Sequence, residues 1–361
     1  MGTTHICTAG IIYNSIGYRI MVTTFGNNII DAYTGGSSVN SIYAYGSLVW
    51  SRRPPKEYYI KWTPSNISSG TFSIAGVTYN FSDYNGYFSG FNGRITNQAF
   101  YRTSIETIET NAYSIDEDAF RNCSSLITAS LSECEFISSG VFRNCYNFQE
   151  VFAPECKKVN NFAFRSCLSL VSISLPLCSY LGNGAFEYCF SLKTAYVPNA
   201  RIDSNVFRYC SELETVVIPQ LSSVPVGTFL GDNSLLSIDL TACSWVGGNA
   251  FQNCYNIESF SVPLLEYIDA AGFMGCSISS IVLPVCSYIG LYAFAYCVNL
   301  KEVTLGYSSV CTLGYNSVDS VYDNFSSAPI SAIYVPSSFV SAYKTAPGWT
   351  SLKNKIYPIP Q

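Results

Sequence analysis

The sequence is poor in histidine, in charge and in long apolar runs. His5 is its only histidine, and charged residues make up 12% of the 361 residues. Without a second histidine, and without any Cys-x-x-Cys pair, the common sets of zinc ligands cannot be assembled. No GxSxG, P-loop or GxGxxG motif is present. These absences argue against an enzyme, and the sequence predicts neither a metal site nor a cofactor.

The charge balance and the hydropathy pattern exclude two further classes of partner. A net charge of -5 provides no electrostatic attraction for the phosphates of a nucleic acid. No stretch reaches 18 consecutive apolar residues, so no membrane-spanning helix is expected. Residues 1–7 lack the basic start and the apolar core of a secretory signal peptide. Either the protein is not secreted by that route, or its leader is missing from this chain.

A phenylalanine recurs every 21 or 22 residues along the chain. A fixed period in this range, with a Leu-x-x-Ile-x-Leu core, indicates a leucine-rich-repeat solenoid. In the coil of residues 164–181, Leu170, Ile173 and Leu175 fit the inward positions of a short strand. We therefore predict a mainly β protein whose right-handed parallel solenoid has about eleven coils, caps included. The repeating phenylalanines are Phe120, Phe142, Phe164, Phe186, Phe207, Phe229, Phe251, Phe273 and Phe294.

The 15 cysteines follow the same period. Eight stand three residues after a repeating phenylalanine, and only Asp232 interrupts that column. Five others form a second column, in which Ala200, Leu221 or Leu265 replaces the missing members. Exchange of cysteine for alanine or leucine indicates a site for a compact apolar group. We therefore expect free, buried thiols rather than disulfides.

Residues 1–95 differ from the repeats that follow. Short apolar runs alternate there with glycine, asparagine and serine, which predicts a small antiparallel β domain. We expect this domain to attach the protein to a partner protein in a larger assembly. Residues 96–361 should form the solenoid. At its far end, residues 337–344 predict a short Ser-capped helix whose Tyr343, with Trp349 beyond it, seals the last coil.

Two sets of outward positions are candidates for ligand contact. Small hydroxyl residues dominate the outward strand positions, and Phe152, Tyr196 and Val217 are the large apolar exceptions. Such groups mark an interaction patch or pack against neighbouring strands. A further column of aromatic residues stands directly before the inward aliphatic residue of the second strand in several coils. These aromatic residues form ligand contacts or stacking platforms for sugars. The alternative is that they only shield the edge between coils. The members of this column are Phe136, Tyr180, Trp245, Tyr267 and Tyr288.

The repeat Ala-Phe-x-x-Cys-x-x-Leu-x-x-Ile-x-Leu-Pro, as in residues 163–176, resembles the BspA-type leucine-rich repeat of bacterial surface proteins. The tail, residues 335–343, is similar to the closing segment of those proteins. The resemblance covers residues 99–357 and implies adhesion to host proteins or to other cells rather than catalysis. It carries no ligand-binding residues over to this chain.

Residues 42–50, Ile-Tyr-Ala-Tyr-Gly-Ser-Leu-Val-Trp, resemble a short sequence found in virion proteins of phages that infect gut bacteria. This resemblance implies a non-catalytic structural or receptor-binding protein of a virion. The alternative is a bacterial cell-surface adhesin that binds host proteins or glycans on its solenoid. The two readings differ in localisation, virion against cell surface, and agree that the solenoid displays a binding surface.

Overall fold

The computed structural model describes residues 7–13, 19–25, 28–34, 37–38, 41–44, 47–51, 56–63, 70–219, 221–306, 309–315 and 323–360. The chain divides into two compact units, Met1–Glu57 and Tyr58–Gln361. The predicted boundary at residue 95 therefore differs from the observed one, because residues 58–95 pack as part of the solenoid. His5 lies outside the described residues.

The first unit is built from antiparallel strands, as predicted. Its four-stranded sheet contains β1 (Cys7–Tyr13), β2 (Arg19–Phe25), β3 (Asn28–Thr34) and β4 (Ser37–Ser38). A separate hairpin pairs β5 (Ser41–Ala44) with β6 (Ser47–Ser51). This hairpin contains most of residues 42–50, although Tyr45 and Gly46 lie outside the described residues.

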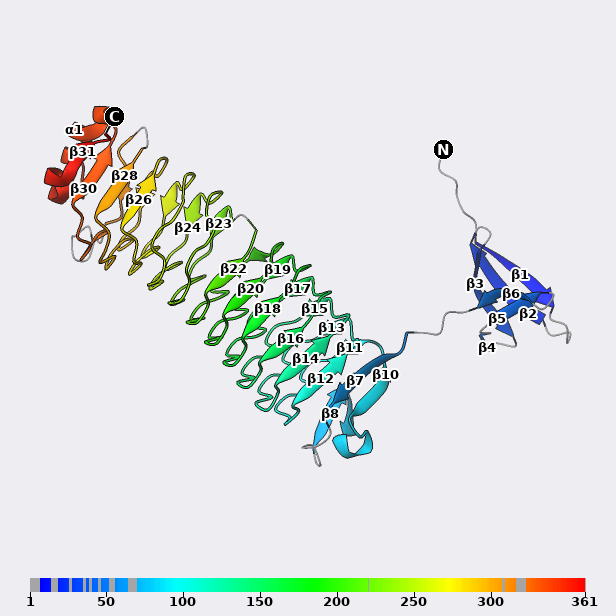
Figure 1. Ribbon diagram of the computed structural model, residues 1–361. Coiled ribbons are helices and arrows are strands. Elements are labelled where there is room, and N and C mark those ends of the chain that lie inside the picture. Colours follow the sequence, from blue (N-terminus) through cyan, green and yellow to red (C-terminus); the bar gives the residue numbers. More distant parts are fainter. Residues whose placement is uncertain are drawn as a thin grey trace, which may run out of the picture. The chain divides into compact units, whose positions relative to one another are not determined.

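The second unit is a parallel β-solenoid of about 12 turns, close to the predicted eleven (Figure 1). Each regular coil contributes a strand to a first row, in which inward Ala, Val or Ile alternates with outward polar residues. The first row consists of β12 (Thr107–Thr110), β14 (Thr128–Leu131), β16 (Glu150–Phe152), β18 (Ser172–Ser174), β20 (Thr194–Tyr196), β22 (Thr215–Val217), β26 (Ser280–Leu283), β28 (Glu302–Leu305), β30 (Ala332–Val335) and β31 (Ile356–Pro358).

After a turn, each coil adds a two-residue strand to a second row. Its second residue is buried in almost every coil and its first faces outward. The second row consists of β11 (Arg94–Ile95), β13 (Ser114–Ile115), β15 (Phe136–Ile137), β17 (Lys158–Val159), β19 (Tyr180–Leu181), β21 (Arg201–Ile202), β23 (Ser223–Val224), β24 (Trp245–Val246), β25 (Tyr267–Ile268), β27 (Tyr288–Ile289) and β29 (Thr312–Leu313).

The third side of each coil is a turn that carries the repeating phenylalanine. Its backbone also bonds from coil to coil, as where the amide of Phe164 donates to the carbonyl of Ala185 at 2.8 Å. The phenylalanine rings point inward and stack in an unbroken series from Phe100 to Phe325, with centroids 4.9–5.8 Å apart. Stacked rings bury a large apolar area and fix the register of each coil on the next.

The cysteine column lies directly beside this stack. Each of its thiols donates a hydrogen bond to the carbonyl of the phenylalanine one coil earlier, at 2.9–3.2 Å. The fourteen cysteines from Cys123 to Cys311 are free and buried, as predicted. Burial raises the pKa of the Cys123 thiol to about 11, so these groups are structural rather than reactive.

The N-terminal end of the solenoid is covered by a cap of antiparallel strands. The cap contains β7 (Tyr58–Trp62), β8 (Thr71–Ile74), β9 (Val77–Asn80), the 3₁₀ turn η2 (Phe81–Asp83) and β10 (Tyr87–Phe91). β7 pairs antiparallel with β12 at the edge of the first row. The ring of Phe72 stacks on that of Phe100 at 5.1 Å, so an aromatic cluster closes the phenylalanine series.

The C-terminal end is sealed by η3 (Ser337–Phe339), α1 (Val340–Thr345) and η4 (Thr350–Lys355). Tyr343 and Trp349 are fully buried there, and the Trp349 indole donates to the carbonyl of Cys311 at 2.7 Å. The predicted seal is confirmed. The predicted serine cap is not, because no side chain caps this helix and the segment enters it through a 3₁₀ turn after Pro336.

Candidate functional site

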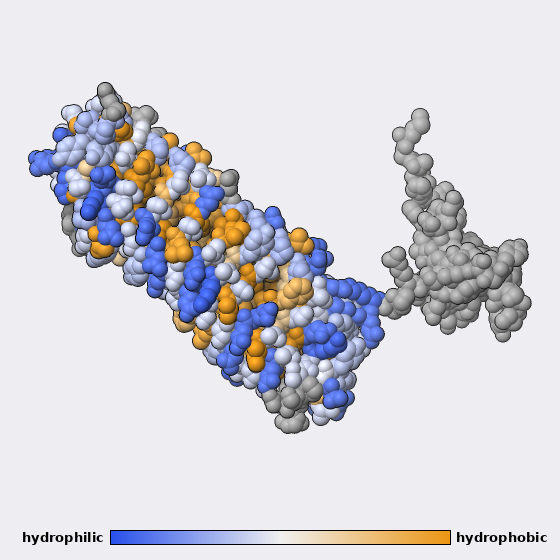
Figure 2. All heavy atoms as spheres, in the orientation of Figure 1, coloured by the Kyte–Doolittle hydropathy of each residue, from blue (hydrophilic) through white to orange (hydrophobic). Residues whose placement is uncertain are grey.

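The first row of strands presents the large apolar residues that the sequence singled out. Phe152, Tyr196 and Val217 each end a first-row strand, and their exposed fractions are 58%, 45% and 42%. Tyr196 lies in register with Val217 on one side and with Ser174 on the other. The structure thus brings the three residues onto one solvent-facing surface, which we call the strand face. Apolar residues also gather along the solenoid on the side seen in Figure 2.

A hollow of about 520 Å³ lies at the N-terminal end of the strand face, where the cap strand β7 meets β12, β14 and β16. Phe152 forms part of its wall. Hydroxyl and charged groups form most of the remainder: Lys61, Thr63, Thr107, Glu109, Thr128, Ser130 and Glu150. Hydrogen-bonding groups beside an exposed aromatic ring suit a polar ligand with an apolar face, such as a sugar or a peptide side chain.

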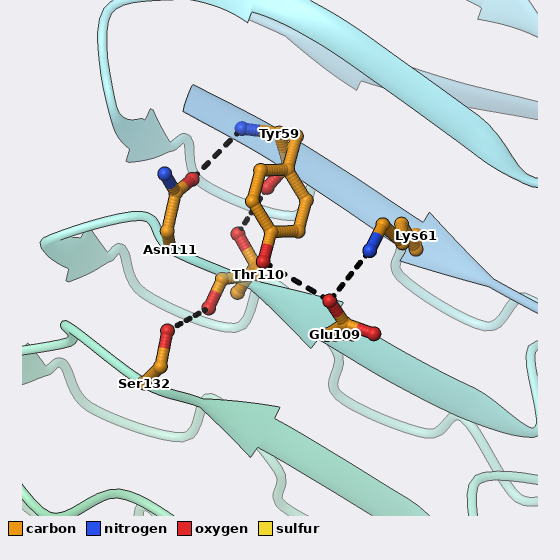
Figure 3. A network of polar contacts seen from close by, with 6 residues as sticks. All are labelled: Tyr59, Lys61, Glu109, Thr110, Asn111 and Ser132. Carbon is orange, nitrogen blue, oxygen red and sulfur yellow. Dashed lines mark hydrogen bonds and ion pairs between the residues drawn. The ribbon is translucent and has the colours of Figure 1, made fainter. Parts of the chain in front are cut away.

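A polar network fixes the wall of this hollow (Figure 3). Lys61 of β7 forms an ion pair with Glu109 of β12 at 2.7 Å, and the Tyr59 hydroxyl donates to the same carboxylate at 3.0 Å. The hydrogen bond from Lys61 lowers the pKa of Glu109. On the other side of the strand, the Thr110 hydroxyl donates to the carbonyl of Tyr59 at 2.6 Å. The network locks β7 onto the first row, and both the Lys61 and the Tyr59 donors bind the same Glu109 oxygen, Oε1.

The aromatic column Phe136, Tyr180, Trp245, Tyr267 and Tyr288 lies on the second row, apart from the strand face. Tyr267 and Tyr288 stack between adjacent coils at 4.4 Å. The ammonium of Lys158 lies 5.2 Å from the centre of the Tyr180 ring, and the Tyr180 hydroxyl donates to Asp203 at 3.3 Å. These contacts accord with a role in shielding the edge between coils. Ligand binding by this column stays a prediction.

Sequence reasoning overlooked a third column, on the turn side of the coils. The residue directly after the repeating phenylalanine is arginine in four coils: Arg121, Arg143, Arg165 and Arg208. Glu187 takes this position between the last two, is almost fully buried, and pairs with Arg165 at 3.1 Å and with Arg208 at 3.8 Å. The 22-residue spacing of the first three arginines was a visible signal.

Neither a metal centre nor a membrane span was found in the described part of the chain. No group of three or more His, Cys, Asp or Glu side chains is placed to hold a metal ion there. None of the described helices is both long and apolar enough to cross a bilayer.

Comparison with known proteins places the repeats in a family. The model of the BspA type leucine rich repeat region matches six copies within residues 93–258 and 266–353, more than half of the chain. No curated protein matches the sequence.

Several solved structures match the chain. A leucine-rich-repeat protein of T. pallidum shares 23% identity over 45% of this chain and 71% of its own, with a TM-score of 0.36. A leucine-rich cell surface protein of Faecalibacterium prausnitzii shares 17% identity over 74% of this chain and 80% of its own, with a TM-score of 0.40. The pneumococcal vaccine antigen PcpA shares 14% identity over 74% of this chain and 77% of its own, with a TM-score of 0.49. On the family match, the chain belongs to the BspA-type leucine-rich-repeat family.

Proposed function

We propose that this is a non-catalytic adhesion protein whose strand face contacts a partner. The observation that carries the proposal is the set Phe152, Tyr196 and Val217, exposed on strands whose other outward residues are mostly small and polar. An exposed aromatic pair with an aliphatic neighbour supplies contact area at low entropic cost. The adjoining hollow adds hydrogen-bonding groups that give such a contact specificity.

The first compact unit is proposed to attach the protein to a larger structure. Since both ends of the solenoid are capped by its own residues, the array does not need this unit to cover an open coil. We therefore assign attachment to residues 1–57, rather than to the whole of residues 1–95. The resemblance of residues 42–50 favours the virion of a gut phage as the larger structure. A bacterial cell surface is the alternative, and it suits the repeat family equally well.

The test compares the adhesion of three variants with that of the unaltered protein, on intact gut bacteria and on immobilised host matrix proteins. The variant Phe152→Ser/Tyr196→Ser/Val217→Ser should lose at least about tenfold in affinity, since truncated hot-spot residues each cost ~1–2 kcal/mol. The control Leu177→Ser/Leu264→Ser/Val298→Ser removes comparably exposed apolar side chains from other parts of the coils. It should bind like the unaltered protein.

A protein that lacks residues 1–57 forms the third arm. It retains the whole compact unit Tyr58–Gln361, so it should bind the same targets in solution. It should fail to appear in purified phage particles or on the producing cell, whichever carries the full chain. Equal adhesion by the strand-face variant, or full incorporation of the truncated chain, would refute the corresponding half of the proposal.

A further inference from the structure

The turn side of the solenoid carries a row of like charges that the strand-face proposal does not use. Arg121, Arg143 and Arg165, here called the arginine column, occupy the same position in three successive coils. Their backbones are tied together, since the amide of Asn122 donates to the carbonyl of Arg143, and that of Asn144 to the carbonyl of Arg165, both at 2.9 Å. The guanidinium groups therefore leave the backbone at the interstrand spacing of ~4.8 Å.

In the part of the chain that the structure describes, carboxylates form ion pairs with only the two end members of this column. Asp118 forms an ion pair with Arg121 at 2.9 Å, and Glu187 with Arg165 at 3.1 Å. Among the described residues, Arg143 has no carboxylate within ion-pairing distance. The guanidinium carbon of Arg143 lies 5.9 Å from the centre of the Phe162 ring.

The central arginine is also held in an unfavourable environment. Its Nε is buried and has no hydrogen-bond acceptor, a feature that it shares with Arg121 and Arg208. Burial, and then the charges of Arg121 and Arg165, lower the pKa of Arg143, and the carboxylates of Asp118 and Glu187 oppose this shift in part. A guanidinium group has five N–H donors in a planar fork that matches the two oxygens of a carboxylate or sulfate. An incoming oxyanion would neutralise the repulsion and use these donors at the same time.

We propose that the arginine column binds the oxyanion groups, carboxylate or sulfate, of an acidic polysaccharide, with Arg143 as its central contact. The column is partly exposed, with exposed side-chain fractions of 30% at Arg121 and 29% at Arg165. It follows the solenoid axis, so it can meet anions on successive units of a linear polymer. The rings of Phe162 and Tyr188 lie within 5.5 Å of the Arg165 guanidinium and add apolar contact beside the charges. Because the net charge is -5, attraction to a polyanion has to be local to this column.

Dextran sulfate is the probe, and neutral dextran of equal length is its control. Calorimetric titration at low ionic strength should show binding of dextran sulfate alone. Arg143→Gln should weaken that binding about tenfold, the worth of a charge-assisted hydrogen bond. Arg201→Gln makes the same charge change at an exposed position of the second row and should alter binding less than about twofold. Equal losses in the two variants, or no binding by the unaltered protein, would overturn the proposal.

Two further arms identify the source of the anion. Inorganic sulfate, at the same concentration of sulfate groups, should compete only weakly, since it lacks the adjacent units of the polymer. Full competition would mean that the ligand is a free ion. Single-stranded DNA of matched charge should bind more weakly than dextran sulfate. Equal binding would replace the polysaccharide by a nucleic acid.

The thermal stability of the variants distinguishes a binding arginine from a structural one. Without polyanion, Arg143→Gln should unfold at the same temperature as the unaltered protein or above it, because repulsion within the column is relieved. A clear drop in unfolding temperature would assign Arg143 a structural role and count against the site. Arg143→Lys keeps the charge without the planar fork, so it should bind dextran sulfate with an affinity between those of the unaltered protein and Arg143→Gln.

Discussion

Two stretches of the first row differ in whether their coils form a strand, although the same phenylalanine stack lies behind both. From β12 to β22 every coil contributes a strand, from Thr107 to Val217. In the next two coils, residues 237–239 and 259–261 occupy the same position but form no strand, and both segments are described. The strands resume at β26. The second row continues through β23, β24 and β25 beside the gap.

The phenylalanine stack passes through both stretches unchanged. The ring of Phe229 lies 5.8 Å from that of Phe207 and 5.3 Å from that of Phe251, as in the regular coils. The turn ladder also continues, with the amide of Phe229 bonded to the carbonyl of Ala250 at 2.8 Å. The register of the solenoid therefore depends on the phenylalanine stack and the turn ladder, since the pairing of the second row is itself interrupted between β21 and β23. The first row can vary locally without disturbing the stack.

Two substitutions coincide with the irregular stretch. Asp232 replaces cysteine beside the stack, and Phe260 occupies an inward strand position that holds Ala, Val or Ile in most other coils. The Phe260 ring packs at a tilt against Phe251 and Phe273, at 5.0 and 4.8 Å. It is only partly buried, whereas Ile173 and Ala195 at this position are almost completely buried. A larger ring at this position leaves less room for a flat strand.

The largest expected effect comes from removing a ring of the stack within the irregular stretch. Phe229→Ala should lower the free energy of unfolding by about 3–5 kcal/mol, through lost burial and an internal cavity. Phe186→Ala removes the equivalent ring where all three sides of the coil are regular. If the stack compensates for the missing strands, Phe229→Ala should lower the free energy of unfolding by at least as much as Phe186→Ala does.

Urea denaturation, with amide exchange to locate the opened coils, measures both variants. Since coils of a solenoid can unfold in segments, exchange should show opening around residues 229–262 in Phe229→Ala. A clearly smaller cost for Phe229→Ala than for Phe186→Ala would mean that the stack is not what holds the irregular coils in register.

The sequence predicted the parts of the fold that are built from the same interior residues in every coil. Phenylalanine, cysteine and the inward aliphatic residues recur because each must fit the same position in every coil, so period and fold class could be read directly. The domain boundary was misplaced because residues 58–91 cap the solenoid with antiparallel strands and turn residues, a pattern that also describes a separate β domain. Packing does not restrict exposed columns in the same way. The roles of Phe152 and Tyr196 therefore stay predictions, and the arginine column was overlooked.

An intermediate effect is expected at Asp232. Its side chain is fully buried, Oδ1 accepts the amide hydrogen of Cys210 at 2.8 Å, and Oδ2 has no partner. Asp232→Cys restores the residue of the other coils and removes this unsatisfied atom. It should raise the free energy of unfolding by about 1–3 kcal/mol at neutral pH. Thermal denaturation of both proteins measures the difference.

The gain from Asp232→Cys should grow with pH. Burial raises the pKa of Asp232 well above its ordinary value of 3.8. Above pH 4 the unfolded chain therefore loses a proton that the folded chain retains, and the native protein becomes less stable as pH rises. Asp232→Asn cannot titrate and should remove the same pH dependence. A difference that stays constant between pH 4.5 and 7.5 would show that Asp232 is ionised in the fold.

The smallest effect on stability is expected at Phe260, where a substitution can give the irregular coil the residue of the regular strands. Phe260→Ile installs the residue type found at this position in β18 and β26. If the ring prevents the flat strand, the amide hydrogens of residues 259–261 should exchange more slowly in the variant, as those of regular first-row strands do. The free energy of unfolding should change by less than about 1.5 kcal/mol, because the lost ring contacts are offset by the new strand bonds. Phe148→Ile, at a buried position outside the inward strand column, controls for the loss of a ring. Unchanged exchange at residues 259–261, together with a loss of stability as large as that of Phe148→Ile, would show that Phe260 fills the core there and that the missing strand has another cause.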